Sequence, residues 1–233
     1  MKPNITSDIS LLATIPRSGC NYFAALLEVC LGHPRIDRHP DCPCFLTENE
    51  KQKSDVFWLT HDNFWSHLPY EDITFPATEK LSIVQIRNPL DVAYSLTQMN
   101  ICPLDTVIEG YNRFADKWLF DFNQDTRLYG NRLVVVYEEL MKSPKTILAQ
   151  SCEHFGYEVD DEKIENSIVL VGDKQNTSSN AGQSKHLKNT HTLTETYNQN
   201  RTKFKVDNSF LYDKITNEEL RNLFYENCST RSL

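Results

Sequence analysis

The chain of 233 residues lacks the features that mark membrane and secreted proteins. No run approaches the roughly 18 consecutive apolar residues that a membrane-spanning helix needs. The first six residues, Met-Lys-Pro-Asn-Ile-Thr, open no apolar segment of the signal-peptide kind. Seven cysteines are an odd number for a disulfide framework. Together these absences predict reduced thiols, a cytoplasmic location and no membrane partner.

The chain also has fewer basic than acidic residues. Lys and Arg total 24 against 32 Asp and Glu, which gives a formal net charge of −8. This balance argues against general binding of nucleic acid, because such binders need an excess of cations. Any anion site must therefore be local. The sequence has no internal repeat or low-complexity segment, and its length suits one α/β domain over residues 1–233.

The N-terminal part of the chain reads as a strand, a tight loop and a helix. An apolar run over residues 9–15 leads into Pro16–Gly19, and apolar residues at helical spacing follow. A helix N-terminus favours an anion, and Arg17 adds a planar cation that suits phosphate or sulfate oxygens. The loop lacks the first Gly and the Lys-Ser/Thr pair of G-x-x-x-x-G-K-[ST], so we expect a P-loop-like anion site and not a P-loop.

Apolar strands alternate with helices over the first two thirds of the chain. Strands are expected at residues 9–15, 55–61, 81–87 and 133–137, and helices after 19, after 88, near 107–122 and over 143–156. This alternation predicts an α/β fold, a single domain with a parallel β-sheet flanked by helices. Ligands bind at the carboxyl ends of such strands. We therefore expect the residues at those ends to converge, namely Arg17, His61, Arg87 and Tyr137.

Two stretches resemble motifs of the PAPS-dependent sulfotransferases, whose donor is 3′-phosphoadenosine 5′-phosphosulfate (PAPS). Residues 16–22, Pro-Arg-Ser-Gly-Cys-Asn-Tyr, are similar to the family's 5′-phosphosulfate loop P-K-S-G-T-[TN]-[WYF]. Residues 87–95, Arg-Asn-Pro-Leu-Asp-Val-Ala-Tyr-Ser, are similar to R-N-P-x-D-x-x-x-S, which holds the 3′-phosphate in the family. Arg87 and Ser95 lie about two helical turns apart on one side, so both can bind one phosphate. The alternative for Arg87 alone is a surface salt bridge, for example with Asp91.

A third stretch, residues 135–140, resembles the family's [FY]-Y-E-[DE]-[ML] segment, whose Tyr contacts the adenine. Tyr22 stands where the family has an aromatic residue against the same base. The resemblance covers residues 9–155 and implies that PAPS binds, leaves as adenosine 3′,5′-bisphosphate (PAP), and needs no metal. The implied nucleotide-binding residues are Arg17, Ser18, Gly19, Cys20, Asn21, Tyr22, Arg87, Ser95 and Tyr137. Cys20 replaces a Thr of the family and loses its hydroxyl donor.

The resemblance implies an in-line sulfuryl transfer with a His general base. The family's base ends the second long strand in K-T-H, and Thr60-His61 matches its last two residues, so His61 is the predicted base. The rival is His67 in a Ser-His-Leu-Pro segment, which we expect in a loop. Arg17 replaces the family's Lys and is expected to act catalytically through its charge, since a guanidinium does not release a proton.

The resemblance ends before the C-terminal third. The family's closing segment R-K-G-x-x-G-D-W-K is missing; Lys185, His186 and Lys188 are candidate substitutes, within residues 172–210 that we expect to form a mobile lid or acceptor loop. The expected partner is a small-molecule acceptor with a hydroxyl or amine, with a homodimer as a further option. Two alternatives stay open, a non-catalytic nucleotide-binding module of the same fold and a nucleotide-dependent kinase. Seven aromatic residues could form an acceptor pocket or core: Phe23, Trp58, Phe64, Trp65, Tyr111, Phe114 and Trp118.

Overall fold

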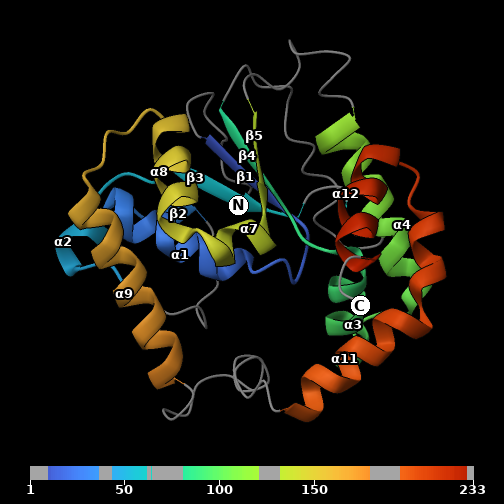
Figure 1. Cartoon of the computed structure of the whole chain (residues 1–233). Helices are drawn as coiled ribbons and strands as arrows, with labels where there is room; N and C mark the ends of the chain where they lie inside the picture. Colours follow the sequence, from blue (N-terminus) through green and yellow to red (C-terminus); the bar gives the residue numbers. More distant parts are fainter. Residues whose placement is uncertain are drawn as a thin grey trace.

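A five-stranded sheet forms the centre of the molecule (Figure 1). The computed structural model describes residues 10–36, 44–61, 64, 81–120, 132–178 and 195–229. The strands lie in the order β2-β3-β1-β4-β5, and every described pairing is parallel. Their bounds are β1 Ser10–Thr14, β2 Arg35–Ile36, β3 Phe57–Thr60, β4 Ser82–Ile86 and β5 Arg132–Val136. The predicted single-domain α/β fold with a parallel sheet flanked by helices is confirmed.

Helices cover both faces of the sheet, as Figure 1 shows. One face packs against α1 (Cys20–Leu31), α8 (Pro144–His154) and α9 (Asp161–Ser178), and the other against α3 (Pro89–Gln98) and α4 (Leu104–Ala115). Neighbouring residues of β1 face opposite sides, because Leu11 and Ala13 belong to one apolar cluster and Leu12 to the other. A strand buried on both faces is therefore apolar at successive positions, as β1 is.

The remaining elements are short or lie late in the chain. They are α2 (Glu48–Lys51), the π-helical η1 (Asp116–Phe120), α7 (Tyr137–Lys142), α11 (Glu195–Asp207), the 3-10 helix η2 (Ser209–Lys214) and α12 (Glu218–Ser229). Among the described residues, no helix combines the length and the apolar character needed to cross a membrane. In the segment 172–210, residues 172–178 end α9 and residues 195–207 form α11.

Local chemistry sets the ends of the two helices that carry the site. The chain enters α1 through Gly19 and leaves it at Gly32, whose N–H bonds to the Glu28 carbonyl oxygen. At α3, the Asn88 side chain accepts hydrogen bonds from the backbone N–H groups of Leu90 and Asp91, and Pro89 occupies the first turn. Glycine is a common helix stop, and Asn followed by Pro a common helix start. The starts of α1 and α3 both lie beside the carboxyl end of a strand.

Some predicted boundaries differ from the observed ones. Tyr137 begins helix α7 and does not end a strand, and the helix predicted near 107–122 is α4 followed by a π-helical turn. Strand β2 is not among the strands expected from sequence, because two residues are too short to show a periodic pattern. Six of the seven aromatic candidates are core residues, with Phe23, Phe64, Tyr111, Phe114 and Trp118 fully buried and Trp58 5% exposed. Trp65 lies outside the described residues.

Candidate functional site

The loop between β1 and α1 is tightly folded at the carboxyl end of the sheet. Arg17 has a φ of 64° and Gly19 a φ of 80°, both in the left-handed region. The Ser18 N–H bonds to the Ile15 carbonyl oxygen at 3.1 Å, and the Ser18 carbonyl oxygen accepts from Nε2 of the buried Gln85 on β4 at 3.0 Å. A left-handed conformation costs a non-glycine residue roughly 1–2 kcal/mol, so surrounding contacts must hold Arg17 in place.

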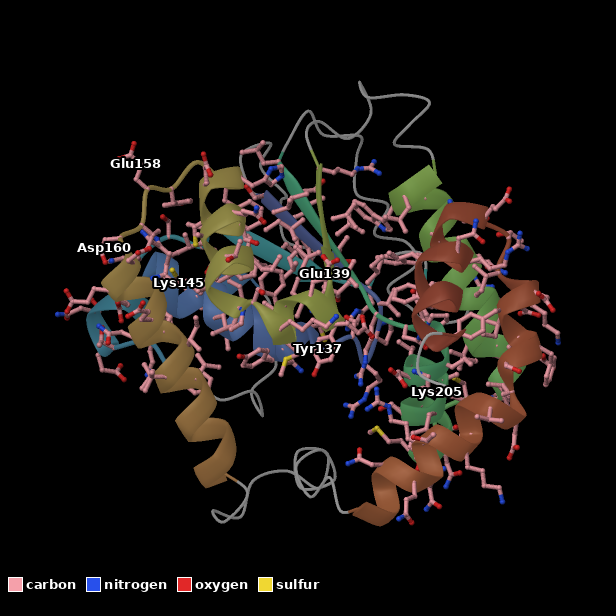
Figure 2. The ribbon with its side chains drawn as sticks, viewed as in Figure 1. Tyr137, Glu139, Lys145, Glu158, Asp160 and Lys205 are labelled. Atoms are coloured by element: carbon pink, nitrogen blue, oxygen red, sulfur yellow. The ribbon has the colours of Figure 1, made fainter. Side chains whose placement is uncertain are left out.

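Gly19 is required by a close contact as well as by its backbone angle. A Cβ atom added at this position would lie 2.3 Å from Cε2 of Tyr137, well inside van der Waals contact. The ring of Tyr137 therefore packs directly on the loop from the start of α7, where Figure 2 labels it. The same ring is covered by the guanidinium of Arg87, whose Cζ lies 4.5 Å from the ring centre, a cation–π contact.

The two predicted cationic groups meet at this loop. Arg17 donates from Nε to Oγ of Ser95 on α3 at 3.0 Å. Arg87 donates from Nη1 to the carbonyl oxygen of Arg17 at 2.8 Å. The arginines are 70 residues apart in sequence, yet one lies against the backbone of the other. Arg17, Ser95 and Arg87 thus form one polar cluster across the ends of β1 and β4, which can bind a polyanion by charge-assisted hydrogen bonds.

Two buried polar atoms of this cluster have no hydrogen-bond partner. They are Nε of Arg87 and Oγ of Ser18, and both are inaccessible to solvent. The backbone of Arg87 is itself anchored, because its carbonyl oxygen accepts from the Tyr111 hydroxyl at 2.6 Å. The next residue is held by Glu138, whose Oε1 accepts from the Asn88 N–H at 3.0 Å. An anchored guanidinium at Arg87 with an unpartnered Nε suits an anionic ligand better than a closed structural network.

The alternative of a salt bridge between Arg87 and Asp91 is not observed, because Asp91 pairs with two cations of α11. Asp91 is buried and accepts hydrogen bonds from Nε and Nη2 of Arg201, at 2.7 and 2.6 Å. Lys205 lies 3.3 Å from the same carboxylate, and both cations come from α11, where Figure 2 labels Lys205. Burial alone would raise the pKa of Asp91, but Arg201 and Lys205 outweigh it and lower that pKa below its usual value. Sequence reasoning missed these two partners.

His61 follows β3 and lies beside β1. Its Nδ1 is 2.8 Å from the carbonyl oxygen of Thr14 and 2.9 Å from the Thr14 Oγ1. Because a carbonyl oxygen only accepts, Nδ1 carries a proton and Nε2 is the basic atom of the neutral ring. The predicted base is thus oriented by the strand next to it. His67, Lys185, His186 and Lys188 lie outside the described residues.

Cys20, the first residue of α1, is hydrogen-bonded to His61. Burial would raise the pKa of the thiol, but the hydrogen bond and charge of His61 lower it overall. Burial would likewise lower the pKa of His61, but the hydrogen bond and charge of Cys20 raise it overall. Each group thus shifts the pKa of the other toward its charged form, and a helix N-terminus is a position where a thiol pKa is commonly lowered.

The remaining predicted nucleotide residues divide into two positions. Tyr22 is partly buried, and this burial is the main cause that raises the pKa of its hydroxyl. Tyr137 raises the same pKa further, so the two residues predicted to contact the adenine interact electrostatically. Asn21 lies on the other side of α1, where its Oδ1 accepts from Nη2 of Arg35 at 3.3 Å. Among the described residues, no three His, Cys, Asp or Glu side chains form a metal-binding group.

Comparison with known proteins identifies the fold. No family model matches the chain, and no curated protein does. The solved structure of mouse sulfotransferase SULT7A1 complexed with PAP aligns with a TM-score of 0.59 at 18% identity, covering 97% of this chain and 90% of the mouse chain. Retinol dehydratase in complex with androsterone and PAP aligns with a TM-score of 0.45 at 15% identity, covering 88% of this chain and 81% of the other. Its complex with retinol and PAP aligns with a TM-score of 0.43 at 14% identity, covering 88% of this chain and 82% of the other. On the evidence of the first alignment, this chain has the cytosolic-type sulfotransferase fold.

Proposed function

We propose that the protein is a PAPS-dependent sulfotransferase that sulfates a hydroxyl or amine of a small-molecule acceptor. The observation that carries the proposal is the single cluster of Arg17, Ser95 and Arg87 at the carboxyl ends of β1 and β4. The solved SULT7A1 structure with this fold holds PAP. Two cationic groups in one cluster are what a nucleotide with phosphates at both its 3′ and 5′ positions requires.

The residues present fit such a nucleotide. Arg87 has a buried Nε without a hydrogen-bond partner, Ser18 has a buried Oγ in the same situation, and α1 begins at the loop. Tyr137 packs against Gly19 and acts electrostatically on Tyr22, so two tyrosines adjoin the phosphate-binding cluster. We assign the 3′-phosphate to Arg87 and Ser95, the 5′-phosphosulfate to Arg17 and residues 18–20, and the adenine to Tyr22 and Tyr137.

PAPS supplies the activated sulfuryl group when it is bound. Arg17 remains charged throughout and stabilises negative charge that develops on nearby oxygens. His61, with its Nδ1 proton held by the Thr14 carbonyl, takes the acceptor proton on Nε2. The acceptor oxygen or nitrogen then bonds to sulfur while the bond from sulfur to the bridging oxygen breaks, and PAP leaves. The hydrogen bond to Cys20 must give way to the acceptor before this proton transfer.

The engagement of His61 by Cys20 supports one second candidate, a module that binds the nucleotide without catalysis. A thermal-shift comparison of PAP, AMP, and ATP with magnesium tests for the nucleotide. A ligand at about 100 times its dissociation constant stabilises the folded state by about 2.7 kcal/mol. We expect PAP to be preferred over AMP. A preference for ATP with magnesium would instead support a kinase.

Turnover of radiolabelled PAPS with mixed acceptors then separates the enzyme from the binder. We expect His61→Ala to abolish sulfuryl transfer while PAP still stabilises the protein. If wild type binds PAP but transfers no label to any phenol, alcohol or amine, the binding module is correct. If His67→Ala is the inactive variant and His61→Ala is active, the base is His67.

A further inference from the structure

Arg35 is a buried arginine that neither the motifs nor the proposed chemistry uses. It lies on the edge strand β2 and is 5% exposed. Its backbone N–H donates to Oε1 of Glu28 at 3.2 Å, and its side-chain Nε lies 3.9 Å from Oε2 of the same carboxylate. Nη2 donates to Oδ1 of Asn21 at 3.3 Å. Because Asn21 is in the first turn of α1, the guanidinium extends along the helix toward the site.

Most of the donor capacity of this guanidinium is unused. Nε and Nη1 of Arg35 are buried, and neither has a hydrogen-bond partner among the residues that the structure describes. The carboxylate of Glu28 balances the charge but, at 3.9 Å from Nε, does not accept its proton. A guanidinium has five N–H donors, and buried donors normally find a protein atom, an ordered water or a ligand. Two unpartnered nitrogens on a buried cation therefore point to a missing acceptor atom.

The position of Arg35 identifies which ligand could supply that atom. In the order β2-β3-β1-β4-β5, the strand of Arg35 lies beyond the strand that His61 follows, and the strand that Arg87 follows lies on the opposite side of β1. The positive charge of Arg35 lowers the pKa values of both Cys20 and His61, so the guanidinium acts on this pair. Arg35 pairs with Phe57 at the start of β3, and its side chain extends to Asn21 in the first turn of α1. The guanidinium therefore lies on the β2 side of His61, and the nucleotide cluster lies on the β4 side.

We propose that Arg35 binds a carboxylate of the acceptor, so that the preferred acceptors are small hydroxy or amino compounds that carry an acid group. This inference rests on the proposed function, because it places an acceptor beside His61. An acidic acceptor approaching a chain of net charge −8 needs a local cation to bind. The unused N–H groups of Arg35 meet that need by charge-assisted hydrogen bonds.

Binding to the wild-type protein tests the proposal without requiring turnover. The probes are 4-hydroxyphenylacetate, 4-hydroxybenzoate and 4-hydroxybutyrate, each compared with its uncharged methyl ester by titration calorimetry, with and without saturating PAP. We expect at least one acid to bind about tenfold or more tightly than its ester. If no acid binds more tightly than its ester under either condition, the proposal is wrong.

Variants of Arg35 test whether this residue causes the preference for the acid over its ester. Arg35→Met alone leaves Glu28 buried without its cation, so the double variant Arg35→Met/Glu28→Gln keeps the position neutral. We expect this double variant to lose the preference for the acid while it binds the ester and PAP as wild type does. Arg35→Lys should keep part of the preference. Equal loss of acid and ester binding, or a loss of PAP affinity, would mean that Arg35 has a structural or donor-binding role and would overturn the proposal.

The proposed function can fail independently. If the wild-type protein does not bind PAP but binds an acid through Arg35, the anion site is supported and the sulfotransferase assignment is wrong. If the protein binds PAP and sulfates neutral acceptors with no preference for acids, the sulfotransferase assignment is supported and the anion site at Arg35 is wrong. PAP binding and the acid–ester ratio therefore report on separate claims.

Discussion

Nη1 of Arg87 donates a hydrogen bond to the main-chain carbonyl oxygen of Arg17 at 2.8 Å. This bond joins the end of β4 to the loop after β1, so the left-handed backbone at Arg17 is held by the second cation of the site. The polar cluster of Arg17, Ser95 and Arg87 is therefore one unit, and a substitution at either arginine should disturb both of the proposed phosphate positions.

Replacing Arg87 tests this unit. A hydrogen bond to a charged group contributes roughly 1.5–3 kcal/mol, so Arg87→Met should weaken PAP binding by roughly 10- to 150-fold. Arg87→Lys should recover part of the loss, because it restores the charge without the fork. Calorimetric PAP affinity is the measurement. The control is Lys163→Met, an exposed cation on α9, and equal effects at both positions would contradict the assignment.

Gly19→Ala should be much more damaging than a glycine substitution at a similar backbone angle. Gly156 has a φ of 82°, but an added Cβ meets nothing within 4 Å, whereas at Gly19 it would lie 2.3 Å from Cε2 of Tyr137. Gly156→Ala should cost roughly 1–2 kcal/mol of stability from the backbone alone. Gly19→Ala should cost more and also lose PAP affinity, as measured by denaturant unfolding and calorimetry. Tyr137→Ala in the Gly19→Ala background should recover the part of the lost stability that exceeds the backbone cost; no recovery would exclude the contact as its cause.

The pH dependence of sulfuryl transfer should report on Cys20. The hydrogen bond and charge of Cys20 raise the pKa of His61, against the effect of burial, so the imidazole stays protonated to a higher pH. A general base acts when neutral, so activity should rise with pH through that raised pKa. Cys20→Ser removes the thiol whose hydrogen bond and charge raise this pKa, so the rising limb of kcat/KM should move to lower pH. Cys102→Ser is the control, and an unmoved limb in Cys20→Ser would exclude this coupling.

The docking of α11 should depend on Asp91. Its pKa is lowered from 3.8 by Arg201 and Lys205 despite burial, so its contribution to stability is present above pH 3.8 and lost as the pH falls through the lower folded value. A double-mutant cycle of Asp91→Asn and Arg201→Met should give a coupling of roughly 1–3 kcal/mol in urea unfolding. The exposed pair of Asp105 and Lys214 is the control, with an expected coupling of about 0–1 kcal/mol. Equal couplings would mean that burial of Asp91 adds nothing.

Short-range patterns in the sequence determined strands β1, β3, β4 and β5, the starts of α1 and α3, and the positions of the two predicted phosphate motifs. The apolar run before Arg17, the Asn-Pro start of α3 and the Gly32 stop of α1 each act within a few residues, so each can be read without a partner elsewhere. The alternation of strands and helices then determines that their carboxyl ends share one edge, which is why Arg17 and Arg87 could be paired in advance.

Only the tertiary structure decided which of these residues touch. The partner of Asp91 lies 110 residues away on α11, the ring that excludes a side chain at Gly19 comes from α7, and Arg35 lies on a two-residue strand with no periodic pattern. The Cys20–His61 pair likewise joins the start of α1 to the residue after β3, which lie 41 positions apart in sequence. Such contacts depend on packing between segments that are distant in sequence. The periodicity of one segment therefore cannot predict which side chain of another segment it will contact.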